Sequence, residues 1–373
     1  MTNPIKYFPE GVALGSAFVN REDERNLLIN NIKHNKHSVL IAPRRYGKTS
    51  LVLKVASEMR LPYCAIDLLA AYNEAYVRDQ FASKISRLVF NLLPSVNKAK
   101  KTLIDIFKKL KPEISIGILG QKLSFHMSES PQQDITELLL NLDETAKYFK
   151  KRAVLFVDEF QQISQLKNAH SLEASIRHAV ERSERIAYVF SGSNRQMLKQ
   201  MFGSQGRPLY RLCQTISIER MAKDVYVKHL QKLAHTRWKK RIPEPALERI
   251  FQCTELHPFY MNVLCQLLWE EKMLFTPDKI DALWDNYVKT QRHVISHDMI
   301  DLSLNQRKLI IGLAKSPTKE IQSTEFTSSL SISTSSAQQS LEALLYKDLV
   351  YQREDGLYCV LDPAMKYYLD TVL

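Results

Sequence analysis

The stretch Val39 to Val55 reads VLIAPRRYGKTSLVLKV, and it contains the residues that decide the fold. Its centre, Gly47-Lys48-Thr49, matches the end of the phosphate-binding pattern Gly-x-x-x-x-Gly-Lys-[Ser/Thr]. In that pattern backbone N–H groups surround a phosphate, and the glycine before the lysine lets the backbone approach it closely. The position of the first glycine holds Ala42, followed by Pro43. That glycine mainly serves the turn out of the strand, so a small alanine is compatible with the loop.

The elements on either side of this loop are the ones that the motif requires. Residues 38–43 form a short apolar run typical of a strand buried in a parallel sheet, and residues 49–59 have helical periodicity. A helix N-terminus adds partial positive charge at the phosphates. We therefore expect a nucleotide site formed by the loop residues and the first helical turn, namely Ala42, Pro43, Arg44, Arg45, Tyr46, Gly47, Lys48, Thr49 and Ser50. Lys48 would reach the β- and γ-phosphates, and Thr49 would bind Mg²⁺.

A second motif lies far along the chain, in AVLFVDEF (153–160). Phosphoryl transfer requires an acid that orients magnesium and a base for the attacking water, both at the end of a buried strand. Asp158 is predicted to hold the metal through water, and Glu159 to polarise the nucleophile. The alternative is an acidic pair that only ends a strand. Two separate motifs, each on the element it needs, favour nucleotide binding and hydrolysis.

Alternating strands and helices predict an α/β fold with a parallel sheet and helices on both faces. The predicted strands are residues 38–43, 62–69, 152–159 and 186–193, and the predicted helices include 25–33, 49–59, 75–93 and 171–183. Residues 112–127 alternate apolar side chains around Gly120, which predicts a β-hairpin insertion.

The remaining sequence predicts two further domains. From about 216 to 291 the pattern is helical, with a helix break at Pro258. Helices at 304–314, 323–330 and 335–350, followed by a strand–turn–strand at 351–362, predict a winged helix. We expect an ATPase-type core at 1–215, an all-α lid at 216–297 and a winged helix at 298–373.

Composition limits the possible partners. The net charge of +12 is compatible with nucleic acid, although much of it lies in local runs such as 98–101, 108–111 and 237–241 that are typical of solvated helix faces. The five cysteines are scattered and show no zinc spacing, so a reducing, cytoplasmic setting is expected. No secretory signal and no apolar run of about 20 residues is visible, so no membrane association is expected.

Several segments together resemble a known family, the archaeal-type ATPases of the AAA+/STAND branch of P-loop NTPases, which are related to the origin-recognition ATPases. The segments are FVNREDERNLLINNI, APRRYGKTSL, LFVDEFQQI, VFSGSNRQM, LYRL and HPFYMNVL. The resemblance covers nearly the whole chain and implies ATP and Mg²⁺ as cofactors.

The resemblance also implies roles for residues outside the two motifs. The FVNRE box, with Arg21, would lie near the adenine or the phosphates, although Asn20 stands where the family usually has glycine. Ser191 or Ser193, and less favourably Asn194, would be a polar sensor of the γ-phosphate. The alternative is that the serines only cap the next helix.

Two arginines and a histidine complete the implied site. Arg207 and Arg211 occupy the region of an arginine finger, but the family pattern LYGR would place the arginine one position after Arg211. A surface arginine is the alternative. His257, before Pro258, matches a lid motif that contacts the nucleotide, and otherwise would be a helix-terminus residue.

The third helix of the winged helix offers little positive charge to DNA. Its only cation is Lys347, near the C-terminal end, and Gln338 and Gln339 could touch adenine edges. We expect this domain to pack on the ATPase core or on a protein partner. The predicted function is an ATP-binding, ATP-hydrolysing conformational switch, with a possible homo-oligomer or effector protein as partner. The alternatives are a DNA-associated motor or loader, and a regulatory or defence signalling protein that gates a separate effector.

Overall fold

The computed structural model describes residues 4–19, 21–93 and 128–371. The chain forms two compact units. The α/β unit comprises Arg21–Arg44 and Lys48–Glu219, and the helical unit comprises Met1–Asn20, Arg45–Gly47 and Arg220–Leu373. The hairpin predicted at 112–127 lies outside the described residues, and so does Asn20, which stands where the resembled family usually has glycine.

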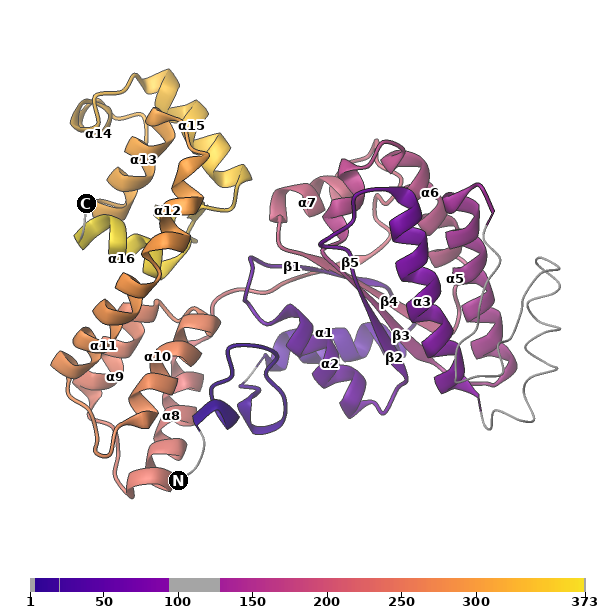
Figure 1. Ribbon diagram of the computed structural model, residues 1–373, viewed down its shortest axis with the longest axis horizontal. Helices are drawn as coiled ribbons and strands as arrows, with labels where there is room; N and C mark the ends of the chain where they lie inside the picture. The colour runs from indigo at the N-terminus through magenta and orange to yellow at the C-terminus, as the bar shows by residue number, and fades with distance from the viewer. Residues whose placement is uncertain (1–3, 20, 94–127, 372–373) are drawn as a thin grey trace. The chain divides into compact units, whose positions relative to one another are not determined.

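A five-stranded sheet forms the centre of the α/β unit (Figure 1). Its strands are β1 (Ser38–Ile41), β2 (Tyr63–Asp67), β3 (Ala153–Asp158), β4 (Ile186–Gly192) and β5 (Gln214–Ser217). They lie in the order β2-β3-β4-β1-β5, and every pair is parallel. The four predicted strands and the parallel sheet are confirmed. The fifth strand falls in QTIS, a short polar segment that carries no strand signal of its own.

Helices cover both faces of this sheet, as expected. They are α1 (Glu22–Lys33), α2 (Lys48–Glu58), α3 (Glu74–Leu92), α5 (Pro131–Tyr148), α6 (Ala169–Val180) and α7 (Arg195–Gly203). Side chains such as Ile41, Val157 and Phe190 form one core with α3, α5, α6 and α7. Because successive strand residues point to opposite faces, the buried Leu40, Phe156 and Val189 lie on the opposite face of the sheet from this core. Helices α1 and α2 lie on the other side of the sheet from α3 and α5 (Figure 1).

The helical unit contains the two predicted all-α and winged-helix segments. The first has α8 (Lys223–Trp238), α9 (Glu244–Thr254), α10 (Pro258–Glu270), α11 (Pro277–Thr290) and α12 (Arg292–Ile300). The winged helix has α13 (Leu304–Lys315), α14 (Thr324–Ser329), α15 (Thr334–Tyr346), β6 (Val350–Gln352), β7 (Tyr358–Val360) and α16 (Pro363–Thr371). The predicted break is confirmed, because α9 ends before Pro258 and α10 begins with it.

A small charged network joins these two segments. Arg220 pairs with Glu255 and donates a hydrogen bond of 2.8 Å to the Leu361 carbonyl, and Lys366 Nζ lies 2.6 Å from Glu255 Oε1. Burial raises the pKa of Glu255, but the two cations outweigh it and the net pKa is lowered. The carboxylate is therefore ionised and ties both segments together. No described helix has the length and apolar character needed to cross a bilayer.

Candidate nucleotide-binding site

The strand order brings the two sequence motifs to one edge of the sheet. Strands β3, β4 and β1 are consecutive neighbours, so their carboxyl ends lie side by side, about 4.8 Å apart from strand to strand. The phosphate-binding loop follows β1, Asp158 ends β3, and Gly192 ends β4 opposite Ile41. Ligands of open parallel sheets bind at this edge.

The loop has the backbone conformation that its glycine requires. Gly47 has φ +85°, in the left-handed region that a side chain would disfavour, and α2 begins at the next residue. Ala42 is fully buried, so a small side chain fits the place of the first glycine. The Lys48 ammonium is buried and donates hydrogen bonds to the carbonyls of Ala42 (3.0 Å) and Pro43 (2.9 Å). Arg44 and Arg45 are exposed, and Ser50 is buried in the first turn of α2.

Thr49 and Asp158 lie in contact, as the magnesium prediction needs. The Thr49 hydroxyl donates to Asp158 Oδ2 at 3.0 Å, and Oδ1 accepts from Ser191 Oγ and from the Glu159 N–H. Mg²⁺ usually takes one or two protein oxygens together with phosphate oxygens and waters, and this oxygen pair fits that demand. The described residues contain no cluster of three His, Cys, Asp or Glu side chains that could hold a metal ion by itself.

Glu159 stands at a sharp turn out of β3. Its backbone is left-handed, with φ 51° and ψ 38°, a conformation that costs a non-glycine residue about 1–2 kcal/mol. The turn places Phe160 in the core, with ring centroids 4.5 Å from Phe190 and 5.8 Å from Phe202. Because Phe160 is anchored, Glu159 is held at the strand end, where its Oε2 accepts from Ser193 Oγ at 2.7 Å.

The structure separates the two alternatives for the serines at the end of β4. Asn194 caps α7 by accepting from the Met197 N–H at 3.0 Å. Ser191 and Ser193 are buried and face the acidic pair, and Arg44 Nε lies 3.4 Å from Ser193 Oγ. The serines are therefore placed where a sensor would be, and the sensing role itself stays a prediction.

The predicted arginines differ in their surroundings. Arg207 forms an ion pair with Glu173 of α6, whose carboxyl pKa is raised because burial outweighs the cation. Arg211 is exposed, with its guanidinium 5.0 Å from the Tyr210 ring centroid. Arg21 is buried and donates at 2.6 Å to the Glu219 carbonyl, which ties the start of α1 to the segment after β5.

His257 belongs to the helical unit, and its surroundings fit the helix-terminus interpretation. Its Nδ1 accepts from the Phe259 N–H at 3.2 Å at the start of α10. Burial, with Arg220 and Arg45 nearby, lowers the pKa of His257 to about 3. The ring is therefore neutral at physiological pH. It meets Tyr46, which groups with this unit, edge to face at 4.7 Å.

Sequence reasoning missed one residue beside the acidic pair. Gln161 Nε2 donates to Glu159 Oε2 at 2.6 Å, and the side chain is buried. In the FQQI segment, two adjacent glutamines carry no signal that tells a surface residue from one turned beneath the site.

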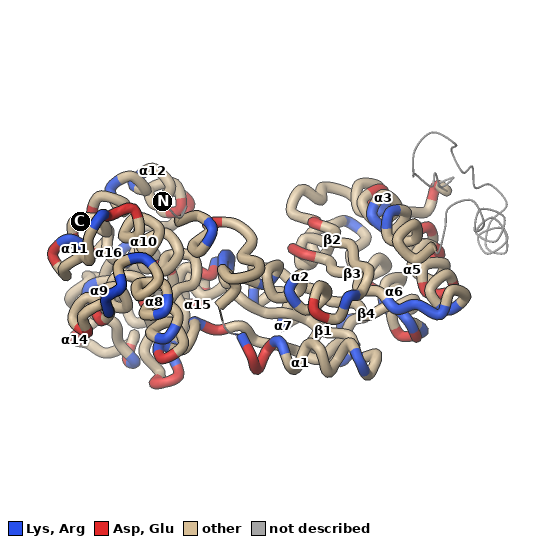
Figure 2. The backbone as a smooth tube through the Cα atoms, turned by 90° about the horizontal axis from the view of Figure 1, so that it is seen from below, with Lys and Arg blue, Asp and Glu red and all other residues tan. Residues whose placement is uncertain are grey.

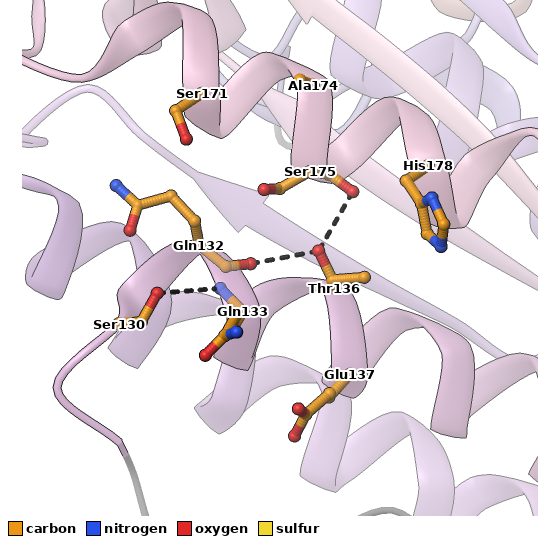
Figure 3. Close-up of a pocket in the computed structure, with 9 residues that line it drawn as sticks. All are labelled: Ser130, Gln132, Gln133, Thr136, Glu137, Ser171, Ala174, Ser175 and His178. Carbon is orange, nitrogen blue, oxygen red and sulfur yellow. Dashed lines mark hydrogen bonds between the residues drawn. The ribbon is translucent and has the colours of Figure 1, made fainter.

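A shallow hollow of about 730 Å³ lies elsewhere in the α/β unit (Figure 3). It lies between α5 and α6, and polar side chains such as Gln132, Thr136 and His178 line it. None of the predicted nucleotide-site residues contributes to its lining. We assign it no part in nucleotide binding.

Two family models match parts of this chain. Residues 296–371 match a family model described as "probable winged helix domain", and residues 18–264 match one described as "ATPase domain predominantly from Archaea". A search of curated protein sequences gave no match.

Two solved structures share the fold over nearly their whole lengths. A Walker-type ATPase from Pyrococcus abyssi has a TM-score of 0.70 and 16% identity, and the match covers 98% of this chain and 99% of that one. The ORC2 protein of Aeropyrum pernix, solved as ADPNP-ADP complexes, has a TM-score of 0.57 and 12% identity, and the match covers 100% and 96%. The predicted resemblance is thereby confirmed. The chain belongs to the family of ATPase domains found predominantly in Archaea, and it carries a winged helix at its C-terminal end.

Proposed function

We propose that this ATPase binds ATP with Mg²⁺ at the carboxyl ends of β1, β3 and β4, and uses slow hydrolysis as a conformational switch. The observation that carries the proposal is the hydrogen bond between Thr49 and Asp158, at 3.0 Å, with Glu159 as the next residue, at the turn out of β3. These residues come from the two separate motifs that phosphoryl transfer requires.

Lys48 has a clear part in this proposal. Its ammonium donates to the Ala42 and Pro43 carbonyls of its own loop. A phosphate oxygen is a stronger acceptor than a neutral carbonyl, so bound ATP would take over these hydrogen bonds. The lysine then neutralises negative charge on the β- and γ-phosphates.

The metal and the two acids divide the remaining work. Bound Mg²⁺ would neutralise charge on the phosphates, with Thr49 and Asp158 as its protein partners. Glu159, held at the strand end by Ser193, would orient and polarise the attacking water. Ser191, which donates to Asp158, would link that carboxylate to the end of β4.

Contacts within the helical unit support the switch. Arg45 and Tyr46 belong to the phosphate-binding loop in sequence, yet they group with this unit. The Arg45 guanidinium carbon lies 4.0 Å from the Phe259 ring centroid, and Tyr46 packs on His257. A loop that rearranges around a nucleotide would act directly on the start of α10, and the network at Glu255 would carry that change to the winged helix.

Two substitutions test the proposal. Lys48→Ala should abolish binding of a fluorescent ATP analogue, whereas Glu159→Gln should keep binding and stall phosphate release. Lys54→Ala is the matched control, because Lys54 lies on the same helix and pairs with Glu58 at 3.1 Å. Normal turnover by Glu159→Gln would remove Glu159 from its role.

A second candidate is a DNA-associated ATPase, which the net charge of +12 favours. In Figure 2, however, Lys and Arg lie on the same helix as Asp and Glu along α1. Helix α15 itself contains no Lys or Arg, and Lys347 Nζ donates a hydrogen bond of 2.9 Å to the Asp301 carbonyl. The exposed Lys239, Lys240 and Arg241 after α8 offer a better cationic surface.

DNA-stimulated ATPase activity distinguishes this candidate from the switch. A gel-shift series in rising salt should show weak binding that Lys239→Ala with Lys240→Ala reduces, and that Gln338→Ala does not change. Tight binding that Gln338→Ala removes would instead assign the winged helix to DNA readout.

A further inference from the structure

The amide of Gln161 is buried directly beside the proposed catalytic carboxylate. The side chain is 3% exposed, and Nε2 donates to Glu159 Oε2 at 2.6 Å. Its other polar atom, Oε1, is also buried and has no hydrogen-bond partner. An amide carbonyl without a partner is costly in a protein interior. A glutamine at this position therefore needs a benefit that an apolar side chain of the same size would not supply.

Gly192, the last residue of β4, makes room for this amide. A Cβ built on Gly192 would lie 1.8 Å from Gln161 Oε1 and 2.9 Å from its Cδ. The amide thus occupies the space that any side chain at 192 would fill. Because Gly192 has no unusual positive φ, the glycine is required by this contact and not by its backbone conformation.

The hydrogen bonds to Glu159 converge on one of its two oxygens. Oε2 accepts from Gln161 Nε2 at 2.6 Å, from Ser193 Oγ at 2.7 Å and from the Ser193 N–H at 3.4 Å. Within the described residues, no side chain or N–H donates to Oε1. The carboxylate is fixed through one oxygen, and the other is left for solvent.

We propose that Gln161 is a positioning residue for Glu159, holding Oε2 jointly with Ser193 so that Oε1 is the oxygen that engages the attacking water. This inference rests on the proposed role of Glu159 as the group that polarises water. A buried donor suits the task, because a hydrogen bond to a carboxylate is short and directional. Gly192 contributes because it has no side chain that would collide with the Gln161 amide.

Substitutions at 161 that keep its volume test the proposal. Gln161→Met removes the donor, and Gln161→Glu replaces it with a second carboxylate. We expect kcat to fall roughly tenfold or more in the first variant and further in the second, since small misplacements of a catalytic group have effects of this size. The Kd for ATP should change less than about twofold, because the loss falls on the chemical step. Gln162→Met is the control. Gln162 is the next residue, and its only hydrogen bond to Glu159 runs from its backbone N–H to the Glu159 carbonyl, which the substitution leaves in place.

A double-mutant cycle with Gly192 supplies a test that does not depend on the stability of any one variant. Gly192→Ala should lower kcat in the natural chain by displacing the amide. It should lower kcat little further in Gln161→Ala, where the space is empty and only Leu198 Cδ1, at 3.2 Å, remains close. Such non-additivity supports the proposal, whereas additive losses overturn it.

The outcomes separate this inference from the function on which it rests. Loss of kcat in Glu159→Gln and in Gln161→Met, with ATP binding and thermal unfolding unchanged, supports both. Loss in Glu159→Gln with full kcat in Gln161→Met overturns the positioning role and leaves the proposed function intact. Full kcat in Glu159→Gln overturns both.

Discussion

Replacing Arg207 by alanine would separate a structural arginine from a catalytic one. Arg207 pairs with Glu173, whose side chain is 0% exposed, while the arginine is 32% exposed. The pair is joined by one hydrogen bond, from Arg207 Nη2 to Glu173 Oε1. The other carboxylate oxygen, Glu173 Oε2, and Arg207 Nε are buried and have no hydrogen-bond partner among the described residues. The structure therefore predicts that Arg207→Ala leaves a buried carboxylate with no cation.

The size of the effect follows from that geometry. Breaking a buried ion pair by removing one partner costs about 3–5 kcal/mol, and partial exposure of Arg207 with a single bond reduces this to about 2–3 kcal/mol. For a unit of this size each kcal/mol lowers Tm by about 2–4 °C, so Tm should fall by roughly 5–10 °C.

The loss should depend on pH in a defined direction. The pKa of Glu173 is raised in the folded state, and losing Arg207 raises it further. A raised carboxyl pKa gives stability that is full below the unfolded pKa, about 4.3, and is lost as pH rises through the folded pKa. The deficit of Arg207→Ala should therefore be large at neutral pH and shrink as the solution is acidified. Thermal unfolding between pH 5 and 8 measures it.

Two further variants complete this experiment. Glu173→Gln combined with Arg207→Ala should recover most of the lost stability, because no buried charge remains. Arg211→Ala should stay within about 0.5 kcal/mol of the natural chain, as expected for an exposed site. Unchanged Tm in Arg207→Ala together with lost ATPase activity would refute the structural role and favour a finger.

Three other predictions follow from described contacts. Burial raises the pKa of Asp143, but hydrogen bonds from the Arg185 N–H and other donors outweigh burial and lower the net pKa. Asp143→Ala should therefore lower the free energy of unfolding by about 2 kcal/mol, measured by urea unfolding at pH 7. The difference in stability between the two chains should narrow as pH falls through the folded pKa of Asp143. The pKa of His257 is lowered to about 3, so the neutral ring contributes stability that is fully present above the unfolded pKa and is lost as pH falls. When the pH is lowered from 7 to 5, the free energy of unfolding should therefore fall less in His257→Asn than in the natural chain. If the exposed Arg211 acts across a subunit contact, Arg211→Ala should lower kcat and remove any rise of specific activity with protein concentration. Light scattering would give the mass of each sample. Specific activity that is the same at all concentrations in both chains would count against this role.

Much of the fold could be predicted because its signals are local. The apolar runs of β1 and β3 and the Gly-Lys-Thr and Asp-Glu motifs need only neighbouring residues to be recognised. Strand β5 could not be predicted, because QTIS becomes a strand only by pairing with β1, which lies far earlier in the chain.

The finer parts of the site depend on contacts that sequence spacing does not show. Glu173 and Arg207 form a pair because α6 and the segment after α7 pack together, and no local pattern joins them. Gln161 is turned under the sheet edge by the left-handed backbone of Glu159 and by the buried Phe160. Asn194 and Ser193 are adjacent polar residues, and only the helix start at Arg195 decides which one caps.

The strand order has a consequence for how this protein is made. Strand β1 carries the phosphate-binding loop, and it pairs only with β4 and β5 in the described sheet. Both of those strands are synthesised long after it, so a nascent chain that ends before Ile186 has β1 with two unpaired edges. All four residues of β1 are buried in the finished sheet, so such a chain would expose an apolar strand to aggregation. Translation must therefore proceed past Ser217 before the loop has its full support, and shorter N-terminal fragments should need a chaperone.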